Sequence, residues 1–171
     1  MTNLTALSPL AGFSPRIGLY VAQMDDVRRR TKAYVDGLTS EQLAWYPQPN
    51  VESIGTLLVH IAAVERSWIG EDIERRPMDE EWKIGFPIRF GIAQISGKPL
   101  SYFLEQLDAV RAETHTALAR LTDDDLQQEI TPLDGGDSAE RFTIEWILYH
   151  LIEHEAHHKG QIALMKRLLP K

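Results

Sequence analysis

The sequence predicts an all-α protein: a four-helix bundle with a small β-hairpin before the last helix. Three observations support this fold class. Four long segments carry apolar residues at steps of three and four, the period of one face of an α-helix. Glycine, proline and asparagine are nearly absent from the interiors of these segments and are concentrated between them. The 171 residues suffice for one domain with a real core but hardly for two, so residues 1–171 are expected to form a single domain.

The four helical segments follow one another along the chain. In the first, the apolar residues Ile17, Val21 and Met24 lie on one face. Pro99 opens the third, because proline is favoured at the first helical position, and Thr143 is a plausible N-cap for the fourth. Amphipathic helices of this kind bury their apolar faces against one another in an antiparallel bundle. The predicted ranges are residues 15–38, 53–75, 99–121 and 143–169.

Three connections join the helices. Residues 39–52 are expected to hold a short helical turn. Residues 77–98 are long and aromatic, and are expected to pack over one end of the bundle. Residues 128–142 contain Asp134-Gly135-Gly136-Asp137 between short β-tolerant runs, which predicts the hairpin. The aromatic residues of the second connection are Trp82, Phe86 and Phe90.

The chain also contains an imperfect internal repeat. Leu38-Thr39-Ser40-Glu41-Gln42-Leu43 recurs as Leu121-Thr122-Asp123-Asp124-Asp125-Leu126, each time at the end of a long helix. The helices that follow align as well. Two helical hairpins related by a pseudo-twofold axis would explain this pattern. The aligned pairs are His60 with His150, Glu65 with Glu155, and Gly70 with Gly160.

Composition excludes several classes of function. The chain has no cysteine, which rules out disulfides, thiolate metal ligands and a cysteine nucleophile. A net charge of −7 argues against a nucleic-acid partner. No apolar run approaches the roughly 18 residues that span a bilayer, and the N-terminus does not resemble a signal peptide. We therefore expect a cytoplasmic protein that binds neither nucleic acid nor membrane.

The histidines are the most informative residues, because five of the six lie in the second and fourth helical segments. His154 and His158 occupy the apolar seam of the fourth helix, one turn apart, so both can point a nitrogen at one metal ion. His150 and His158 are about 12 Å apart along the helix axis and cannot easily share an ion. The usable pair is therefore either His150 with His154 or His154 with His158. A buried, hydrogen-bonded imidazole is the alternative for any single histidine.

A third ligand must come from another helix. His60 leans toward the core seam of the second helix, and His115 is the only other candidate. Three imidazoles and a water would make an open site of the catalytic type. His157 lies about 60° from the line of His154 and is expected to be at the surface or behind the ligands. His115 is expected to be solvated.

The stretch His154-Glu155-Ala156-His157-His158 also matches the His-Glu-x-x-His motif of zinc peptidases, in which the glutamate is the general base. The rest of the peptidase pattern is missing, since only 13 residues follow His158. Glu155 and Glu65 are alternatively residues that orient ligand imidazoles through their second nitrogen, or exposed helical glutamates. We take Glu155 as the candidate catalytic residue.

The chain resembles the DinB-like proteins, a family of YfiT-like metalloenzymes. The resemblance covers most of the chain and is carried by three motifs: Leu38-Thr39…Leu43…Pro47, Ser53-Ile54-Gly55-Thr56-Leu57-Leu58-Val59-His60, and His150…His154-Glu155-Ala156-His157-His158-Lys159-Gly160-Gln161-Ile162. It implies an up-down-down-up four-helix bundle, a homodimer, and a divalent metal held by His60, His154 and His158, with His150 outside the ligand set. Several branches of the family are thiol-dependent transferases or hydrolases.

The leading functional hypothesis is a divalent-metal-dependent transferase or hydrolase that acts on a small molecule in stress or detoxification. Because the chain lacks cysteine, thiol chemistry would need an external low-molecular-weight thiol as cosubstrate. Zinc is the first expectation for the metal, with nickel or iron as alternatives, since imidazole binds all three. A non-catalytic helical protein braced by its metal is the competing hypothesis, followed by the zinc peptidase. The aromatic segment 77–98 and Trp68 are the residues expected at the homodimer interface.

Overall fold

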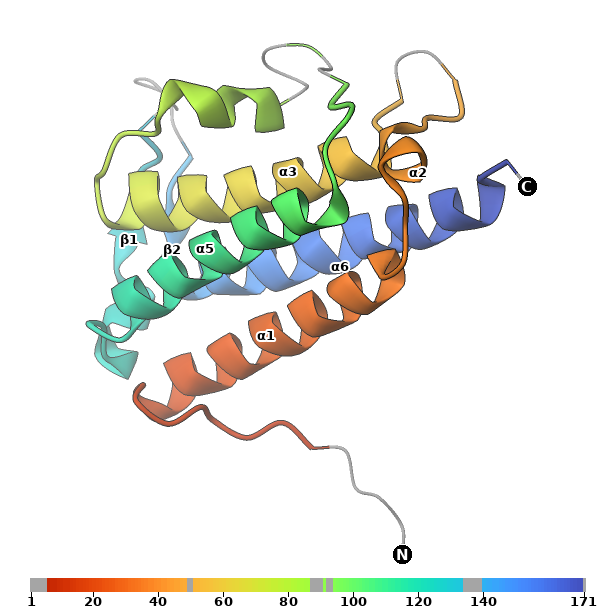
Figure 1. Ribbon diagram of the computed structural model, residues 1–171. Helices are drawn as coiled ribbons and strands as arrows, with labels where there is room; N and C mark the ends of the chain where they lie inside the picture. Colours follow the sequence, from red (N-terminus) through yellow and green to blue (C-terminus); the bar gives the residue numbers. More distant parts are fainter. Residues whose placement is uncertain (1–5, 49–50, 87–90, 92–93, 134–139, 171) are drawn as a thin grey trace, which may run out of the picture.

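The computed structural model describes residues 6–48, 51–86, 91, 94–133 and 140–170, and these residues are mostly helical (Figure 1). The long helices correspond to the four predicted segments, and the short helical turn predicted within residues 39–52 is α2. The α-helices are α1 (Pro15–Val35), α2 (Ser40–Ala44), α3 (Ile54–Arg66), α5 (Leu100–Leu118) and α6 (Ile144–Leu168). The other helical elements of the described residues are a π-helix, η1 (Ser67–Ile73), and two 3₁₀ helices, η2 (Glu80–Gly85) and η3 (Asp123–Gln127).

Side-chain caps explain where these helices begin. The hydroxyl of Ser53 accepts a hydrogen bond from the Thr56 N–H, and that of Thr143 accepts one from Trp146, so donors in the first turn are satisfied. The repeat is visible in the short elements, because Thr39 and Thr122 each form a capping box, at the start of α2 and η3. The predicted second helix continues past α3 as the π-helix η1, which shifts the register of its last turns.

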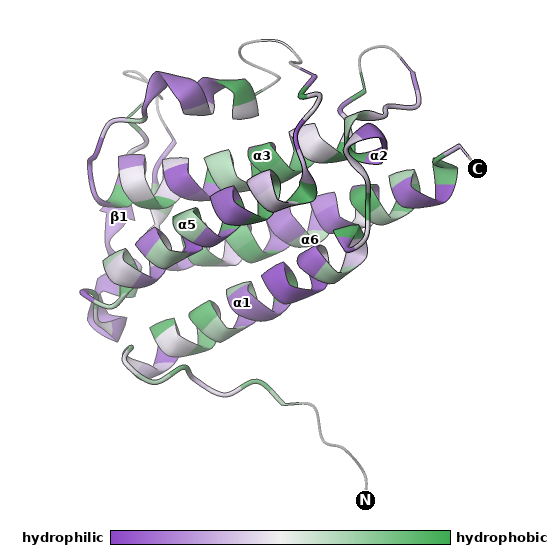
Figure 2. Ribbon diagram, in the orientation of Figure 1, coloured by the Kyte–Doolittle hydropathy of each residue, from purple (hydrophilic) through white to green (hydrophobic). Residues whose placement is uncertain are grey.

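The long helices pack side by side, α1 against α6 and α3 against both α5 and α6 (Figure 1). Figure 2 shows hydrophobic residues recurring between hydrophilic ones along each of them. One core cluster lies around α3 and α5 and includes Leu58, Phe103 and Leu107. A second lies around α1 and α6 and includes Ile17 and Ile147. Both clusters are built from the apolar periodicity seen in the sequence.

The aromatic connection 77–98 packs differently from the prediction. Its helix η2 lies along the outer side of α3 and not over an end of the bundle (Figure 1). The reason is that Trp82 buries its ring against α3, with 7% of the residue exposed. Phe86 is partly buried as well, whereas Phe90 lies outside the described residues. Trp82 and Phe86 therefore pack into the chain's own core.

The predicted hairpin pairing is confirmed. β1 (Glu129–Ile130) pairs antiparallel with β2 (Phe142–Thr143), with Glu129 opposite Thr143 and Ile130 opposite Phe142. The predicted turn, Asp134-Gly135-Gly136-Asp137, lies outside the described residues. Among the described helices, none has the length and apolar character needed to cross a bilayer.

Candidate metal centre

Three imidazoles meet where α3 packs against α6. His60 comes from α3, and His154 and His158 come from successive turns of α6. The Nε2 atom of His154 lies 3.1 Å from Nε2 of His60 and 3.1 Å from Nε2 of His158. One ring nitrogen from each of the three residues lies within 4.8 Å of the others, a spacing at which they could hold one metal ion.

The second ring nitrogens of two of these histidines are bound elsewhere. His60 donates its Nδ1–H to the backbone carbonyl of Gly85, at 2.6 Å. Nδ1 of His158 lies 2.6 Å from Oε1 of Gln161, which accepts the proton in the same way. A proton on Nδ1 leaves Nε2 unprotonated, with a free lone pair. Both rings therefore present a ligand atom toward His154. Neither Gly85 nor Gln161 was predicted to take part in the site.

Burial keeps these imidazoles neutral. Burial, the largest cause, and the neighbouring imidazoles, His158 first, together lower the pKa of His154 to about 2. Burial lowers the pKa of His158 to about 4, against the opposing effect of its bond to Gln161. The pKa of His60 is also lowered by burial, although the Gly85 carbonyl and the charge of Glu52 oppose the shift. Neutral imidazole is the form that binds a metal ion.

The three Nε2 atoms of this cluster have too few protons to form hydrogen bonds at both of their close contacts. The Nε2 atoms of His60 and His158 are both acceptors, and His154 can donate from Nε2 to only one of them at a time. At least one of the two 3.1 Å contacts between Nε2 atoms therefore has no proton to make it a hydrogen bond. A divalent cation would satisfy all three nitrogens at once, so the donor set fits a metal ion.

The family model of the DinB superfamily matches residues 23–162. The chain belongs to the DinB superfamily. The resemblance seen in the sequence is thus confirmed, and the matched region spans all three histidines of the cluster.

The solved structures similar to this DinB-superfamily chain include two bacterial proteins. A conserved protein from Enterococcus faecalis is 18% identical, with a TM-score of 0.68, and the match covers 88% of this chain and 94% of that one. A DinB-like protein from Bacillus cereus is 21% identical, with a TM-score of 0.65, and the match covers 88% of this chain and 90% of that one. Likeness at these identities shows a shared fold. No curated protein matches the chain.

The other histidines lie around the cluster or away from it. His150 stacks on Trp146, with ring centroids 4.9 Å apart, and its centroid is 5.7 Å from that of His154. His157 is exposed on α6, in line with the predicted surface position. His115 is only partly solvated, less than predicted. Its Nε2 lies 3.1 Å from a carboxylate oxygen of Asp25, and one third of its side chain is exposed.

Glu155 does not have the surroundings of an exposed or free carboxylate. Only 3% of the residue is exposed, and its oxygens accept from Arg28 Nε at 2.9 Å and from Arg111 Nη2 at 3.5 Å. Glu65, its partner in the repeat, is equally buried and pairs with Arg28 Nη2 at 2.6 Å and Arg111 Nε at 2.7 Å. The exposed-glutamate alternative is therefore wrong for both residues.

This network also bears on the zinc-peptidase interpretation, which needs Glu155 as a general base beside the metal. The carboxylate oxygens of Glu155 are instead bound by two arginines, Arg28 and Arg111. A signal for the burial was present in the sequence: Glu155 follows Leu151 by four residues and Glu65 follows Ile61 by four, so both continue a core-facing row. The arginine partners on α1 and α5 carried no such signal, because they come from distant helices.

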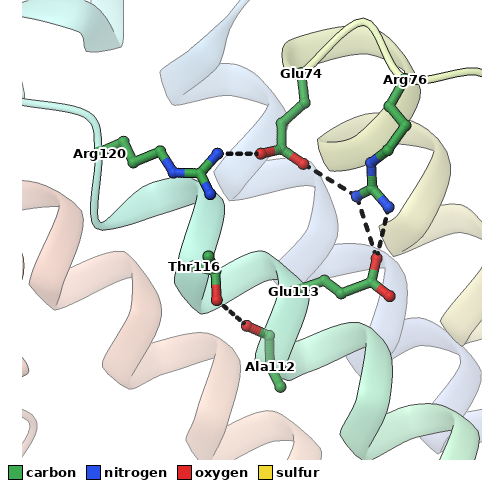
Figure 3. A pocket seen from close by; sticks show the side chains of 6 residues that line it. All are labelled: Glu74, Arg76, Ala112, Glu113, Thr116 and Arg120. Carbon is green, nitrogen blue, oxygen red and sulfur yellow. Dashed lines mark hydrogen bonds and ion pairs between the residues drawn. The ribbon is translucent and has the colours of Figure 1, made fainter.

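A separate concavity of about 520 Å³ lies between the end of η1 and α5 (Figure 3). Arg76 pairs with both Glu74 and Glu113, and Arg120 pairs with Glu74 at 3.1 Å. No histidine is among its lining residues, and its acidic groups are each bound by arginine. These charges neutralise one another, so this groove has the character of a surface ion-pair network. The lining residues are Glu74, Arg76, Ala112, Glu113, Thr116 and Arg120.

Proposed function

We propose that the protein is a divalent-metal-dependent enzyme that acts on a small molecule, as a thiol-dependent transferase or a hydrolase. The observation that carries the proposal is the convergence of three neutral imidazoles, two of which present unprotonated Nε2 atoms. We assign His60, His154 and His158 as the ligands of one ion. Three protein ligands leave a coordination position for water or substrate, which is typical of catalytic sites and not of closed structural ones.

The residues of the chain have defined parts in this proposal. When bound, a divalent ion with three neutral ligands is a Lewis acid that lowers the pKa of a water or a thiol toward neutrality. Gly85 and Gln161 hold the rings of His60 and His158 by their Nδ1 atoms. Glu155 takes an indirect part. Its ion pair with Arg28 links the part of α6 that carries His154 and His158 to α1. The thiol comes from a cosubstrate, because the chain has no cysteine.

The metal content of the protein tests the ligand assignment. Protein purified without a polyhistidine tag should carry one divalent ion per chain, with zinc expected before nickel or iron. His158→Ala should abolish tight binding, whereas His157→Ala, one position away at an exposed site, should retain it. Stoichiometric metal in the His158→Ala protein would overturn the assignment.

Catalysis is tested separately on the metal-loaded protein. A screen with low-molecular-weight thiols and electrophilic or hydrolysable small molecules should give turnover that His158→Ala loses. A metal-loaded protein without turnover, whose ion exchanges no ligand, would favour the alternative of a helical protein braced by its metal.

The order of the long helices is proposed to be the up-down-down-up order implied by the resemblance, within a single cytoplasmic domain.

The homodimer remains a proposal, and we propose different residues for its interface. Trp82 is buried within the chain, and the ring of Trp68 is partly buried and packs edge-on against Phe142, 5.2 Å between centroids. The exposed apolar side chains of α6 are better candidates for a surface between two copies. They are Trp146, Tyr149, Leu164 and Leu168, with 39%, 54%, 56% and 53% of each residue exposed.

A further inference from the structure

His60 is bound from outside the bundle by a backbone group. The acceptor of its Nδ1 proton is the carbonyl of Gly85, 25 residues further along the chain and in η2. A carbonyl can only accept, so this bond requires the proton of the neutral ring to be on Nδ1. The bond therefore determines which nitrogen of His60 faces the other two imidazoles.

Glycine at position 85 is what allows η2 to come this close. A Cβ built at Gly85 would overlap the Cβ of Ala63 on α3 and would lie 3.3 Å from the backbone oxygen of Val59. Any larger residue must therefore push η2 away from α3. The Gly85 carbonyl lies 2.6 Å from His60 Nδ1, a distance that leaves little room for such a displacement.

Other contacts hold η2 on α3 without help from a metal. Trp82 is buried with 7% of the residue exposed, and the guanidinium of Arg66 lies 5.4 Å from the centre of its ring. Phe86, directly after Gly85, meets the His60 ring edge-on, with centroids 6.4 Å apart. The carbonyl is thus part of a docked segment and not of a freely moving loop.

We propose that η2 is a positioning element of the metal centre, and that Gly85 fixes the Nδ1–H tautomer and the orientation of His60. The proposal rests on the proposed metal-binding function. It makes metal affinity depend on a residue that is no ligand and belongs to neither ligand-bearing helix. Loss of such a partner typically weakens metal binding 10- to 100-fold.

Zinc titration of three variants tests this dependence. Gly85→Ala should weaken zinc binding by about 10- to 100-fold. The double variant Ala63→Gly/Gly85→Ala removes the methyl that the new Cβ meets, and should recover most of that loss. Gly160→Ala is the matched control, because a Cβ there meets nothing within 4 Å, and it should bind zinc as the unaltered protein does. Equal zinc affinity in Gly85→Ala and the unaltered protein would overturn the proposal.

The tautomer of His60 gives a readout that a merely structural role would not move. In the metal-free protein, ¹⁵N NMR should show His60 protonated on Nδ1, and in Gly85→Ala the proton should shift toward Nε2. Protonation on Nε2 in the unaltered protein would refute the role of Gly85. This measurement needs no metal, so the two proposals can fail separately. Failure of the protein to bind zinc would overturn the proposed function, whereas the tautomer of His60 would still test the role of Gly85. If Gly85→Ala does not fold, the unaltered protein and the double variant decide it.

Discussion

The buried carboxylate of Glu65 makes the fold sensitive to acid. It accepts hydrogen bonds from Arg28, Arg111 and the hydroxyl of Thr114, and 3% of the residue is exposed. Burial alone would raise the pKa of this carboxyl. The charges of Arg111 and Arg28, with the hydrogen bonds from Arg111 and Thr114, outweigh burial and lower the pKa from 4.5 to about 2.

The size of the effect follows from linkage between proton binding and folding. The difference between these pKa values corresponds to about 3 kcal/mol in the free energy of unfolding. Because the folded chain has the lower pKa, this stabilisation is fully present above pH 4.5 and is lost as the pH falls toward 2. About 2 kcal/mol of it should be gone by pH 3.

Urea unfolding of metal-free protein between pH 7 and pH 3 measures this loss, with Glu65→Gln as the perturbation. The variant keeps the side-chain shape but has no charge to titrate, and at pH 7 it leaves two buried arginines short of a partner. The gap in unfolding free energy between the unaltered protein and the variant should narrow by about 2 kcal/mol at pH 3. Glu105→Gln, at an exposed position of α5, should follow the unaltered protein at every pH. A constant gap between the unaltered protein and Glu65→Gln would refute the reasoning.

Three further predictions concern the metal and the assembly. Chelation should lower the melting temperature but leave the helical circular dichroism, because the core clusters are apolar and do not depend on the ion; complete loss of helix would contradict this. Gln161→Leu should weaken zinc binding about 10-fold by freeing Nδ1 of His158, and an unchanged affinity in the titration would rule out a role for that contact. Light scattering should give a mass of about 39 kDa, twice the 19.4 kDa of one chain, and Tyr149→Glu should shift it toward the monomer if α6 forms the interface; a monomer mass for the unaltered protein at tens of micromolar would exclude the dimer.

The site could be predicted from the sequence as far as residues on one helix determine it. His154 and His158 are one turn apart on an apolar seam, and this relation holds in any fold that keeps the helix. His60 was a candidate by its position on its own helix, but its partners depend on how α3 packs against α6. Sequence spacing left open whether His150 or His158 pairs with His154, and the structure brings His158 to the cluster while His150 stacks on Trp146.

Local periodicity and capping determined the helices themselves, because each signal acts within a few residues: the apolar rows, Pro15 at the start of α1, and the hydroxyl of Thr143 at the start of α6. What only the tertiary structure decided involves groups far apart in sequence. Arg28 and Arg111 meet the two buried glutamates across 37 to 127 residues. They hold Glu155 in a buried ion network, where the sequence also allowed an exposed position. The Gly85 carbonyl is a backbone group with no side-chain signature at all. Its bond to His60 exists because η2 and α3, which are separate in sequence, pack so closely that only a glycine fits between them.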